Sequence, residues 1–377
     1  DGWQLVWTAA ASAREHGARV LTYHRVTSIE RDGDRVCAVV CTDDKTGEQV
    51  RIDTNFVLNC GGPWSGRIAA SAGCHGVDVV AGAGIMVAFN HRLVNTVVNR
   101  CIHPADGDIL VPVHTVSIIG TTDTRAEDPD HLPIPREEVQ QMLDAAEVLV
   151  PGARQARAVH AWAGARPLVK DARVAATDTR HMSRGVKIID HAERDGLQGF
   201  LTIAGGKLTT YRLMAEHLVN AMEDQLGTRN PCRTAEEACP TAGTHHYTVT
   251  HRLADAEADR ADDPIICECE LMSRSMFVDL LRAQPRASFD DLRRQLRLGM
   301  GPCQGGFCCV RAAGIAHDEG AFDVERSTGL LRLFLANRWL GLWPILYGEQ
   351  ARQAALDNWI MAGTLDIEHL PVGAEVN

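Results

Sequence analysis

The sequence lacks the features of two broad classes of protein. Its net charge is −11, and no stretch interleaves basic with aromatic residues, so nucleic acid is not an expected partner. No apolar run of 18 residues is free of charge. The nearest candidate, residues 330–347, is broken by Arg332, Arg338 and Pro344. We do not expect a segment interrupted in this way to span a bilayer.

The chain also lacks internal repeats and long low-complexity tracts. Its 377 residues, 45% of them hydrophobic, are enough for two or three domains with cores of their own. The opening residues, Asp1-Gly2, already read as the middle of a domain. We therefore expect an upstream segment to be missing.

Twelve cysteines are unevenly distributed, and five of them lie between positions 267 and 309. A secreted disulfide framework would space them differently, so the pattern favours thiols in a reducing, cytoplasmic compartment together with one metal site. The other seven are scattered singly, mostly in apolar runs: Cys37, Cys41, Cys60, Cys74, Cys101, Cys232 and Cys239.

The clustered cysteines follow the pattern Cys267-Glu-Cys269, a long gap, and then Cys303-Gln-Gly-Gly-Phe-Cys308-Cys309. Soft thiolate ligands at such short spacings are typical of iron or zinc centres. The glycines around the second arm let the backbone wrap closely round such a centre; they are Gly301, Gly305 and Gly306.

Zinc and uncoordinated thiols are alternatives to an iron–sulfur centre at this motif. Structural zinc usually uses two C-x2–4-C arms, which a C-x-C arm with a C-x4-C arm fits poorly. The layout resembles the helical 2Fe–2S domain of the bacterioferritin-associated ferredoxin type. That resemblance implies Cys267, Cys269, Cys303 and Cys308 as the metal ligands, with Cys309 a bystander or a substitute for Cys308.

The N-terminal part reads as a mixture of helix and strand. Helical spacing predicts a helix over residues 3–16, and turn signals divide the next stretch into strands at 19–29, 35–41 and 48–60. The last strand runs into Gly61-Gly62-Pro63-Trp64. An apolar strand ending in paired glycines and a new helix lets the backbone approach a nucleotide.

Farther along, the pattern changes to shorter strands with polar alternation, which indicates a separate antiparallel domain. We expect strands at 109–112, 116–122 and 199–204, and helices at 136–149, 208–226, 273–283 and 290–296. The predicted fold class is α/β plus α+β. Its parts are a discontinuous, incomplete FAD-binding Rossmann-like domain (1–80 and 196–227), an antiparallel substrate domain (81–195), a linker (228–263), a small helical 2Fe–2S domain (264–319) and a helical tail (320–377).

The second glycine pair, Gly205-Gly206-Lys207, joins a predicted strand to a predicted helix. Such a turn presents backbone N–H groups and the positive helix end to an anion, for example a reduced flavin ring. Lys207 would add its charge there or bind a substrate phosphate, although a solvated lysine is the plainer interpretation. Arg166, beside Pro167, offers a rigid fork for an oxyanion, with a structural ion pair as its alternative.

Several motifs occur in the order expected for one flavoprotein family. They resemble FAD-dependent glycerol-3-phosphate dehydrogenases, of the amino-acid-oxidase-like superfamily. The cysteine domain and the tail Arg338-Trp-Leu-Gly-Leu-Trp-Pro344 resemble, more narrowly, the large catalytic subunit of the anaerobic enzymes. The motifs are Gly62-Pro63-Trp64-Ser65, Gly120-Thr-Thr-Asp-Thr124, Gly164-Ala-Arg166-Pro-Leu168 and Leu201 to Arg212.

The resemblance implies roles for individual residues. FAD would lie against Val26, Gly61, Gly62, Pro63, Trp64, Gly205, Gly206, Lys207, Leu208 and Thr209. Arg166 and Lys207 would hold the hydroxyl and phosphate ends of the substrate. His91 would be the general base, because an imidazole with a pKa of about 6.5 suits proton transfer near neutral pH. A surface histidine is the alternative at that position.

The implied reaction is oxidation of sn-glycerol 3-phosphate to dihydroxyacetone phosphate, with hydride transfer to FAD. Electrons would leave through the 2Fe–2S cluster and a membrane-anchoring partner subunit to a quinone, which implies a cytoplasmic location at the inner face of the membrane. Two alternative functions are an amine or amino-acid oxidoreductase with the same cysteine domain, and a non-catalytic electron-transfer subunit. The dinucleotide fingerprint G-x-G-x-x-G is absent, so we do not expect this chain alone to hold FAD tightly.

Overall fold

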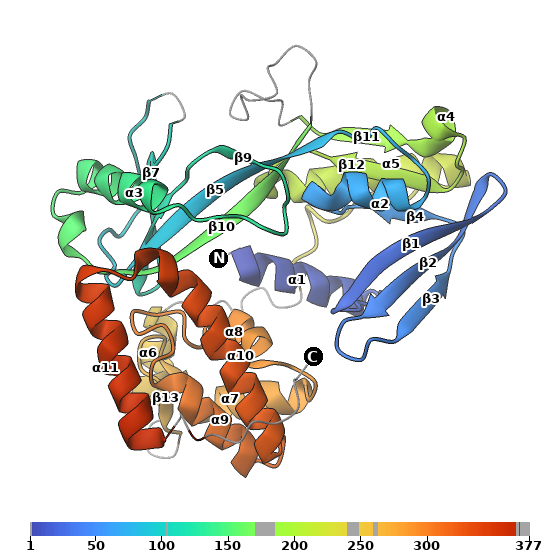
Figure 1. Cartoon of the computed structure of the whole chain (residues 1–377). Coiled ribbons are helices and arrows are strands. Elements are labelled where there is room, and N and C mark those ends of the chain that lie inside the picture. The colour runs from blue at the N-terminus through green and yellow to red at the C-terminus, as the bar shows by residue number, and fades with distance from the viewer. Residues whose placement is uncertain are drawn as a thin grey trace.

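The computed structural model describes residues 2–102, 105–169, 185–239, 249–258, 263–366 and 369. Its described strands form three sheets and one short hairpin. Figure 1 shows the sheets in the upper part of the molecule and the C-terminal helices grouped below them. Helix α1 (Gly2–Glu15) lies between the two parts, and it confirms the helix predicted over residues 3–16.

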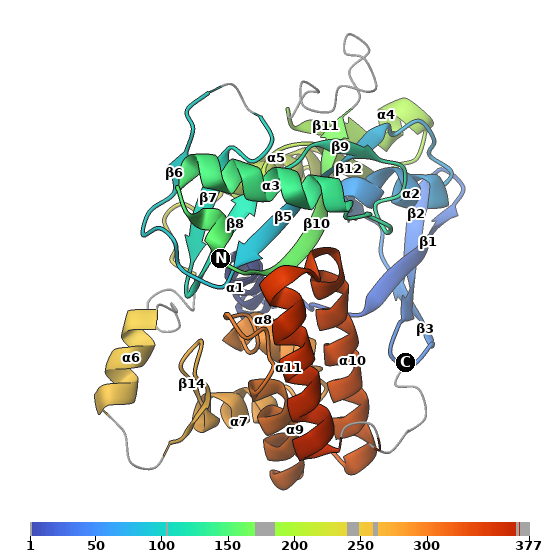
Figure 2. The same cartoon turned by 60° about the vertical axis from the view of Figure 1, so that its left-hand side comes forward.

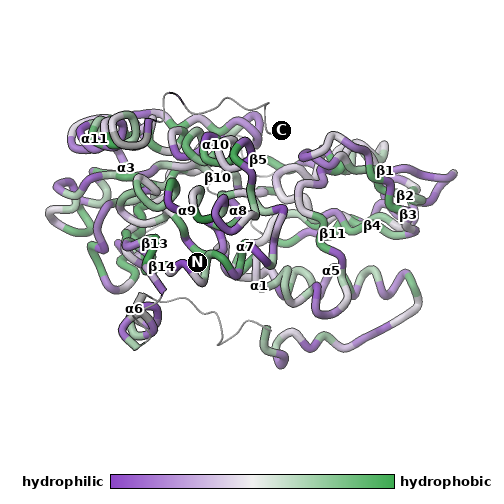
Figure 3. Tube along the Cα trace, turned by 90° about the horizontal axis from the view of Figure 1, so that it is seen from below, coloured by the Kyte–Doolittle hydropathy of each residue, from purple (hydrophilic) through white to green (hydrophobic). Residues whose placement is uncertain are grey.

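A small antiparallel sheet of three strands follows α1. The strand predicted at 19–29 begins only at His24, because Tyr23 takes a left-handed backbone conformation with a φ of 62°. The Tyr23 hydroxyl donates to Asp291 Oδ1 at 2.6 Å, which ties this turn to the C-terminal helices. In Figure 3 the sheet lies at the far end of the molecule from the last helix. The strands are β1 (His24–Asp32), β2 (Arg35–Asp43) and β3 (Gln49–Asp53).

The prediction of one strand over 48–60 is wrong, because this stretch contributes to two different sheets. Its first half is β3, and its second half is β4 (Val57–Asn59), which runs parallel to β12 (Phe200–Ala204). The Thr54 hydroxyl donates to the carbonyl of Phe56 at 2.9 Å and redirects the chain between them. The remaining elements of this unit are β11 (Lys187–Asp190), α2 (Ser65–Ser71), α4 (His191–Asp195) and α5 (Tyr211–Leu226).

The second large unit is a six-stranded antiparallel sheet, which confirms the predicted antiparallel character of this region. Two of its strands are long, however, contrary to the expectation of short ones. Small residues such as Gly82 and Gly164 let β5 and β10 pair along almost their whole lengths. The strands are β10 (Ala158–Val169), β5 (Val79–Phe89), β8 (Val116–Gly120), β7 (Ile109–Val113), β6 (Val98–Asn99) and β9 (Thr124–Ala126); α3 (Arg136–Leu149) packs on them.

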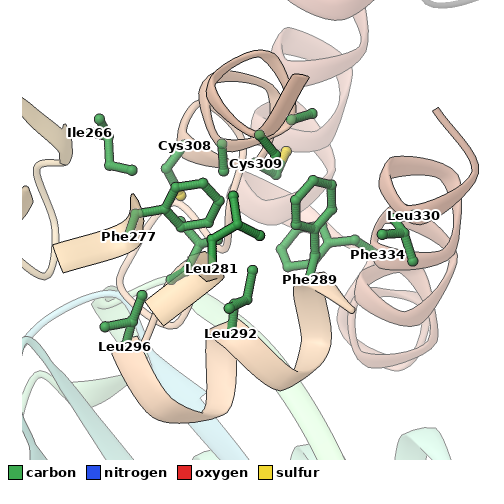
Figure 4. Packing of buried hydrophobic residues seen from close by; sticks show 14 of the residues in the cluster. Ile266, Phe277, Leu281, Phe289, Leu292, Leu296, Cys308, Cys309, Leu330 and Phe334 are labelled. Carbon is green, nitrogen blue, oxygen red and sulfur yellow. The ribbon is translucent and has the colours of Figure 1, made fainter. Parts of the chain in front are cut away.

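The C-terminal helices share one hydrophobic core, in which the tail joins the cysteine-containing segment. Phe334 and Leu330 from the tail pack with Phe277, Phe289 and Leu292 (Figure 4). The two units predicted at 264–319 and 320–377 therefore have a common interior. The elements are β13 (Ile265–Cys267), β14 (Met272–Ser273), α7 (Arg274–Ala283), α8 (Phe289–Leu296), α9 (Cys308–Asp318), α10 (Val324–Leu342) and α11 (Gly348–Leu365).

The predicted linker contains α6 (Val249–Ala258), while its residues 240–248 and 259–262 lie outside the described part of the chain. Figure 2 shows α10 and α11 side by side beneath the end of the β5–β10 pair. Within the described residues, no helix combines the length and the apolar character that crossing a membrane requires.

His160 of β10 lies at this junction, directly against Gly341 of α10. Burial lowers the pKa of the imidazole from its ordinary 6.5 to about 4, with help from the charges of Arg293 and Arg338. Its Nδ1 atom has no hydrogen-bond partner in the described structure. The folded protein therefore holds this histidine neutral.

We expect this junction to weaken in mild acid. Between pH 6.5 and pH 4 the unfolded chain binds a proton at His160 that the folded chain does not, so stability falls as the pH falls. At pH 5 the loss relative to pH 7.5 is about 2 kcal/mol. Denaturant unfolding at both pH values, compared between the wild type and His160→Gln, measures it. An equal pH dependence in the two proteins would contradict the assignment.

Candidate active site and cysteine centre

The turn after β12 is built without side chains at two successive positions. Gly205 and Gly206 have φ values of 81° and 79°. A Cβ atom on Gly205 would collide with the carbonyl oxygen of Gly185, and one on Gly206 with Met214 Sδ. Only glycine therefore fits both positions, and the chain passes through them into an exposed Lys207.

The residues after this glycine pair begin a helix as predicted, but its first turn is a 3-10 turn, Leu208–Thr210, ahead of α5. Thr210 fixes that turn, because its hydroxyl accepts from the Lys207 N–H at 3.2 Å and donates to the Lys207 carbonyl at 3.0 Å. Leu208 and Thr209 are exposed beside it. The turn is thus set before any ligand arrives.

A second glycine turn lies at the same edge of the sheet. Gly61 and Gly62 follow β4, and because β4 and β12 are parallel neighbours, their following turns come together. Trp64, just after this glycine turn, is held by a 2.8 Å hydrogen bond from its Nε1 to Asp130. The two predicted flavin-binding turns therefore share one edge, whereas Val26, also predicted, lies half-exposed on β1 of the separate small sheet.

Sequence reasoning missed the buried polar groups beneath these turns. Asn59 accepts from the Gly61 N–H at 3.1 Å and donates to the Ser65 carbonyl and to Thr202 Oγ1. Thr202 in turn contacts Nε2 of the fully buried His191 at 2.8 Å. These contacts lock the ends of β4 and β12 together. The signals in the sequence were Asn59 at the end of one apolar strand and Thr202 in the middle of another.

Arg166 lies on β10 in a dense set of acceptors. Its Nη1 pairs with Asp123 at 3.0 Å, and its Nη2 donates to the Thr122 carbonyl at 3.1 Å and to Thr121 Oγ1. The Asp123 side chain is 5% exposed and that of Arg166 27%. The ion pair that we considered as an alternative role is therefore present, and it fixes the guanidinium. Val169, three residues farther along the same strand, approaches Gly205.

The structure does not bring His91 to this site. Arg166 is opposite Gly82, near the start of β5, while His91 follows Phe89 at its other end. Gly82 and Phe89 are separated by roughly 23 Å of extended strand. A general base must come within hydrogen-bond reach of the proton it takes. His91 is exposed and lies at the opposite end of the strand pair from Arg166.

We therefore expect His91→Ala to leave catalysis almost unchanged. In the full-length enzyme, kcat/KM should change by no more than about twofold, as for an ordinary surface substitution. Loss of a true general base would cost about a hundredfold or more. Steady-state kinetics across pH 6 to 9 distinguishes the two, and a large loss at high pH would restore His91 to the site.

The four predicted cysteine ligands converge between the β13–β14 hairpin and the start of α9. Hydrogen bonds from the thiols of Cys269 and Cys308 hold the pKa of Cys303 down to about 2. Cys308 also donates to Cys267, whose pKa is lowered in the same way. The donors themselves have raised pKa values. The thiol hydrogen bonds thus link the four sulfur atoms in the order Cys267, Cys308, Cys303 and Cys269, and four thiols gathered in this way are a donor set suited to a soft metal centre.

The glycines of this region behave as predicted. The Gly305 and Gly306 N–H groups donate to the Cys303 sulfur and further lower its pKa. Gly301 lies so close to Cys269 that a Cβ atom there would collide with it. Cys309 packs in the hydrophobic core, where burial raises its pKa to about 12. It is not among the four sulfurs in contact.

Comparisons with known proteins show the family to which the chain belongs. Residues 1–212 match the model of the FAD dependent oxidoreductase family. The chain is 35% identical to a subunit of the anaerobic glycerol-3-phosphate dehydrogenase from Escherichia coli (strain K12), over 98% of this chain and 71% of that protein. The chain belongs to the family of that subunit. The corresponding protein from Haloferax volcanii is also 35% identical, over 100% of this chain and 69% of its own length.

A similar solved structure is the glycerol-3-phosphate dehydrogenase from Bacillus halodurans complexed with FAD. It has 20% sequence identity and a TM-score of 0.48, with 98% of this chain and 73% of that chain covered. Mouse mitochondrial glycerol-3-phosphate dehydrogenase is 31% identical over 56% of this chain and 30% of its own length.

The residues of this member of the dehydrogenase family fit the ring end of a flavin. Two glycine turns meet at one sheet edge, and the second leads into the helical turn Leu208–Thr210 and α5; helix N-termini of this kind suit an anion such as a reduced flavin ring. The mixed α/β unit and the antiparallel sheet are those of an FAD-dependent oxidoreductase.

Proposed function

We propose that this chain carries the substrate site of an FAD-dependent dehydrogenase that oxidises sn-glycerol 3-phosphate to dihydroxyacetone phosphate. The observation that carries the proposal is a fixed guanidinium, Arg166, on the strand whose end approaches a glycine turn, in a chain similar along nearly its whole length to one subunit of the anaerobic form of that enzyme. Bound FAD supplies the hydride acceptor for this chemistry.

Arg166 and Lys207 have separate tasks in the proposed site. Asp123 and the backbone around Thr122 fix the guanidinium of Arg166, and in the proposed site it supplies a positive charge at a fixed position beside the substrate oxygen. Lys207 is an exposed, flexible cation on the other side of the glycine turn, suited to a phosphate group. Together they favour a phosphorylated alcohol over an amino acid.

The cysteine centre is proposed to hold a 2Fe–2S cluster through Cys267, Cys269, Cys303 and Cys308. Backbone N–H groups directed at the sulfurs, as at Cys303, are typical of iron–sulfur sites, where they tune the potential. Such a cluster passes single electrons onward. We propose that a quinone accepts them by way of a membrane-anchoring partner subunit, and hence a cytoplasmic location at the inner face of the membrane.

The test uses the full-length, FAD-loaded protein under anaerobic conditions. Glycerol 3-phosphate should bleach the flavin absorbance, while glycine and proline should not. Dithionite should then produce the paramagnetic signal of a reduced 2Fe–2S cluster, with iron and no zinc by elemental analysis. Bleaching of the flavin by an amino acid instead would favour an amine or amino-acid oxidoreductase. No bleaching with any of these substrates would favour an electron-transfer subunit. Zinc in place of iron by elemental analysis would exclude the 2Fe–2S cluster.

A further inference from the structure

A buried ion pair lies directly beside the cysteine centre. Glu270 follows Cys269 and is fully buried, with its Oε2 3.1 Å from Nε of Arg297. The side chain of Arg297 is 7% exposed, and its backbone has a φ of 65° at the end of α8. Two charges removed from water in this way stabilise a fold only when their geometry is well satisfied.

Further contacts join this pair to the rest of the molecule. Thr115, in the turn between β7 and β8 of the large sheet, donates to Glu270 Oε1 at 3.3 Å. Arg252 of α6 donates to the Glu270 carbonyl at 2.8 Å and to the Leu296 carbonyl at 3.1 Å. The carboxylate of Glu270 is therefore the point where the sheet and the last turn of α8 meet the cysteine hairpin.

Two hydrogen bonds to a cysteine sulfur come from the segments that contain the pair. The backbone N–H groups of Glu270 and Gly299 both donate to Cys267, and both lower its pKa. Glu270 is three residues after Cys267, and Gly299 is two residues after Arg297. The Glu270–Arg297 ion pair thus joins the two segments that supply these donors.

We propose that Glu270 and Arg297 are positioning residues that set the reduction potential of the cysteine centre and dock it on the large sheet. The inference rests on the proposed 2Fe–2S cluster. Hydrogen bonds to the sulfurs and local net charge both tune the potential of such a cluster, and a buried charge is poorly screened. The two members of the pair should therefore act on the potential with opposite sign.

The chain offers a matched control. Glu268 lies on the other side of Cys269, but its side chain is 61% exposed and it pairs with Arg311 at the surface. Glu268→Gln and Glu270→Gln remove the same charge from positions two residues apart in one loop. Solvent screens the first and not the second.

The experiment is a redox titration of the full-length protein followed by the paramagnetic signal of the reduced cluster. Glu270→Gln keeps an acceptor for Arg297 but removes a negative charge, so the midpoint potential should rise. Arg297→Gln removes a positive charge, so the midpoint potential should fall. Arg297→Lys should restore most of the wild-type value, and Glu268→Gln should leave it unchanged.

Iron content and thermal unfolding of each variant are measured alongside. The inference would be overturned if the midpoint potential shifted in the same direction in Glu270→Gln and Arg297→Gln, or did not shift in either. The proposed function would still stand in that case, provided that the wild type contains the cluster. Absence of a cluster from the wild type would overturn both. If Glu270→Gln is not recovered folded, the comparison of Arg297→Gln with Arg297→Lys decides, because only the first removes the charge.

Discussion

Arg166→Ala should lower kcat/KM for glycerol 3-phosphate by about thirtyfold or more in the full-length enzyme, because truncating one partner of a buried charge pair typically costs 2–5 kcal/mol. The loss should appear in both kcat and KM, since the guanidinium both binds and orients. Asp123, whose side chain is 5% exposed, loses its counter-charge as well. Thermal unfolding must therefore be measured beside the kinetics.

Two further variants separate recognition from stability. Arg154→Ala removes an arginine whose ion pair with Asp144 on α3 is exposed, and it should leave both activity and stability nearly unchanged. Arg166→Lys keeps a positive charge but loses the fork, so it should recover stability more than activity. A variant at position 166 with wild-type kinetics would remove this residue from the substrate site.

The sequence predicted best the features that depend on local patterns. The helix expected at 136–149 is α3 with the same bounds, because its apolar residues repeat at helical spacing and Pro135 precedes it. The cysteine arms also came together as expected. The short spacing within each arm leaves the chain few ways to place its two cysteines. Glycine at position 301 allows the backbone to approach Cys269 closely, because it has no Cβ atom.

Features that depend on long-range pairing were not predictable from one sequence. Nothing local shows that the Thr54 hydroxyl divides one apolar run between two sheets, or that the tail residue Phe334 packs among the helices of the cysteine segment. The family resemblance, not a local pattern, placed His91 in one site with Arg166. Only the register of β5 against β10 reveals that the two residues lie at opposite ends of a strand pair.

This strand pair also organises the proposed function. The glycine turns and Arg166 lie at one end of β5 and β10, while Arg157, just before β10, reaches the carbonyl of Pro302 beside Cys303 at the other. Figure 1 shows the pair running from the upper sheets down to the C-terminal helices. The site for substrate and the centre proposed to pass electrons onward are thus held apart by a rigid element.

Cys308→Ala should abolish the cluster, whereas Cys309→Ala, at the next position, should keep it. Cys308 contacts the sulfurs of two other cysteines, while Cys309 points to a different side of α9, into the core (Figure 4). Loss of an outer contact to a metal ligand alone costs 10–100-fold, so loss of a ligand should weaken iron binding by at least about a hundredfold. Iron content and the paramagnetic signal after dithionite report it directly.

Activity measurements on the same variants test the substrate site and the cysteine centre separately. With Cys308→Ala, glycerol 3-phosphate should still bleach the flavin, because the substrate site lies at the other end of the strand pair, but reduction of a quinone acceptor should stop. Cys309→Ala should lose stability only, by about 1 kcal/mol, for the small cavity left in the core. If the two substitutions exchanged these effects, Cys309 would be the fourth ligand and the spacing of the second arm would be C-x5-C.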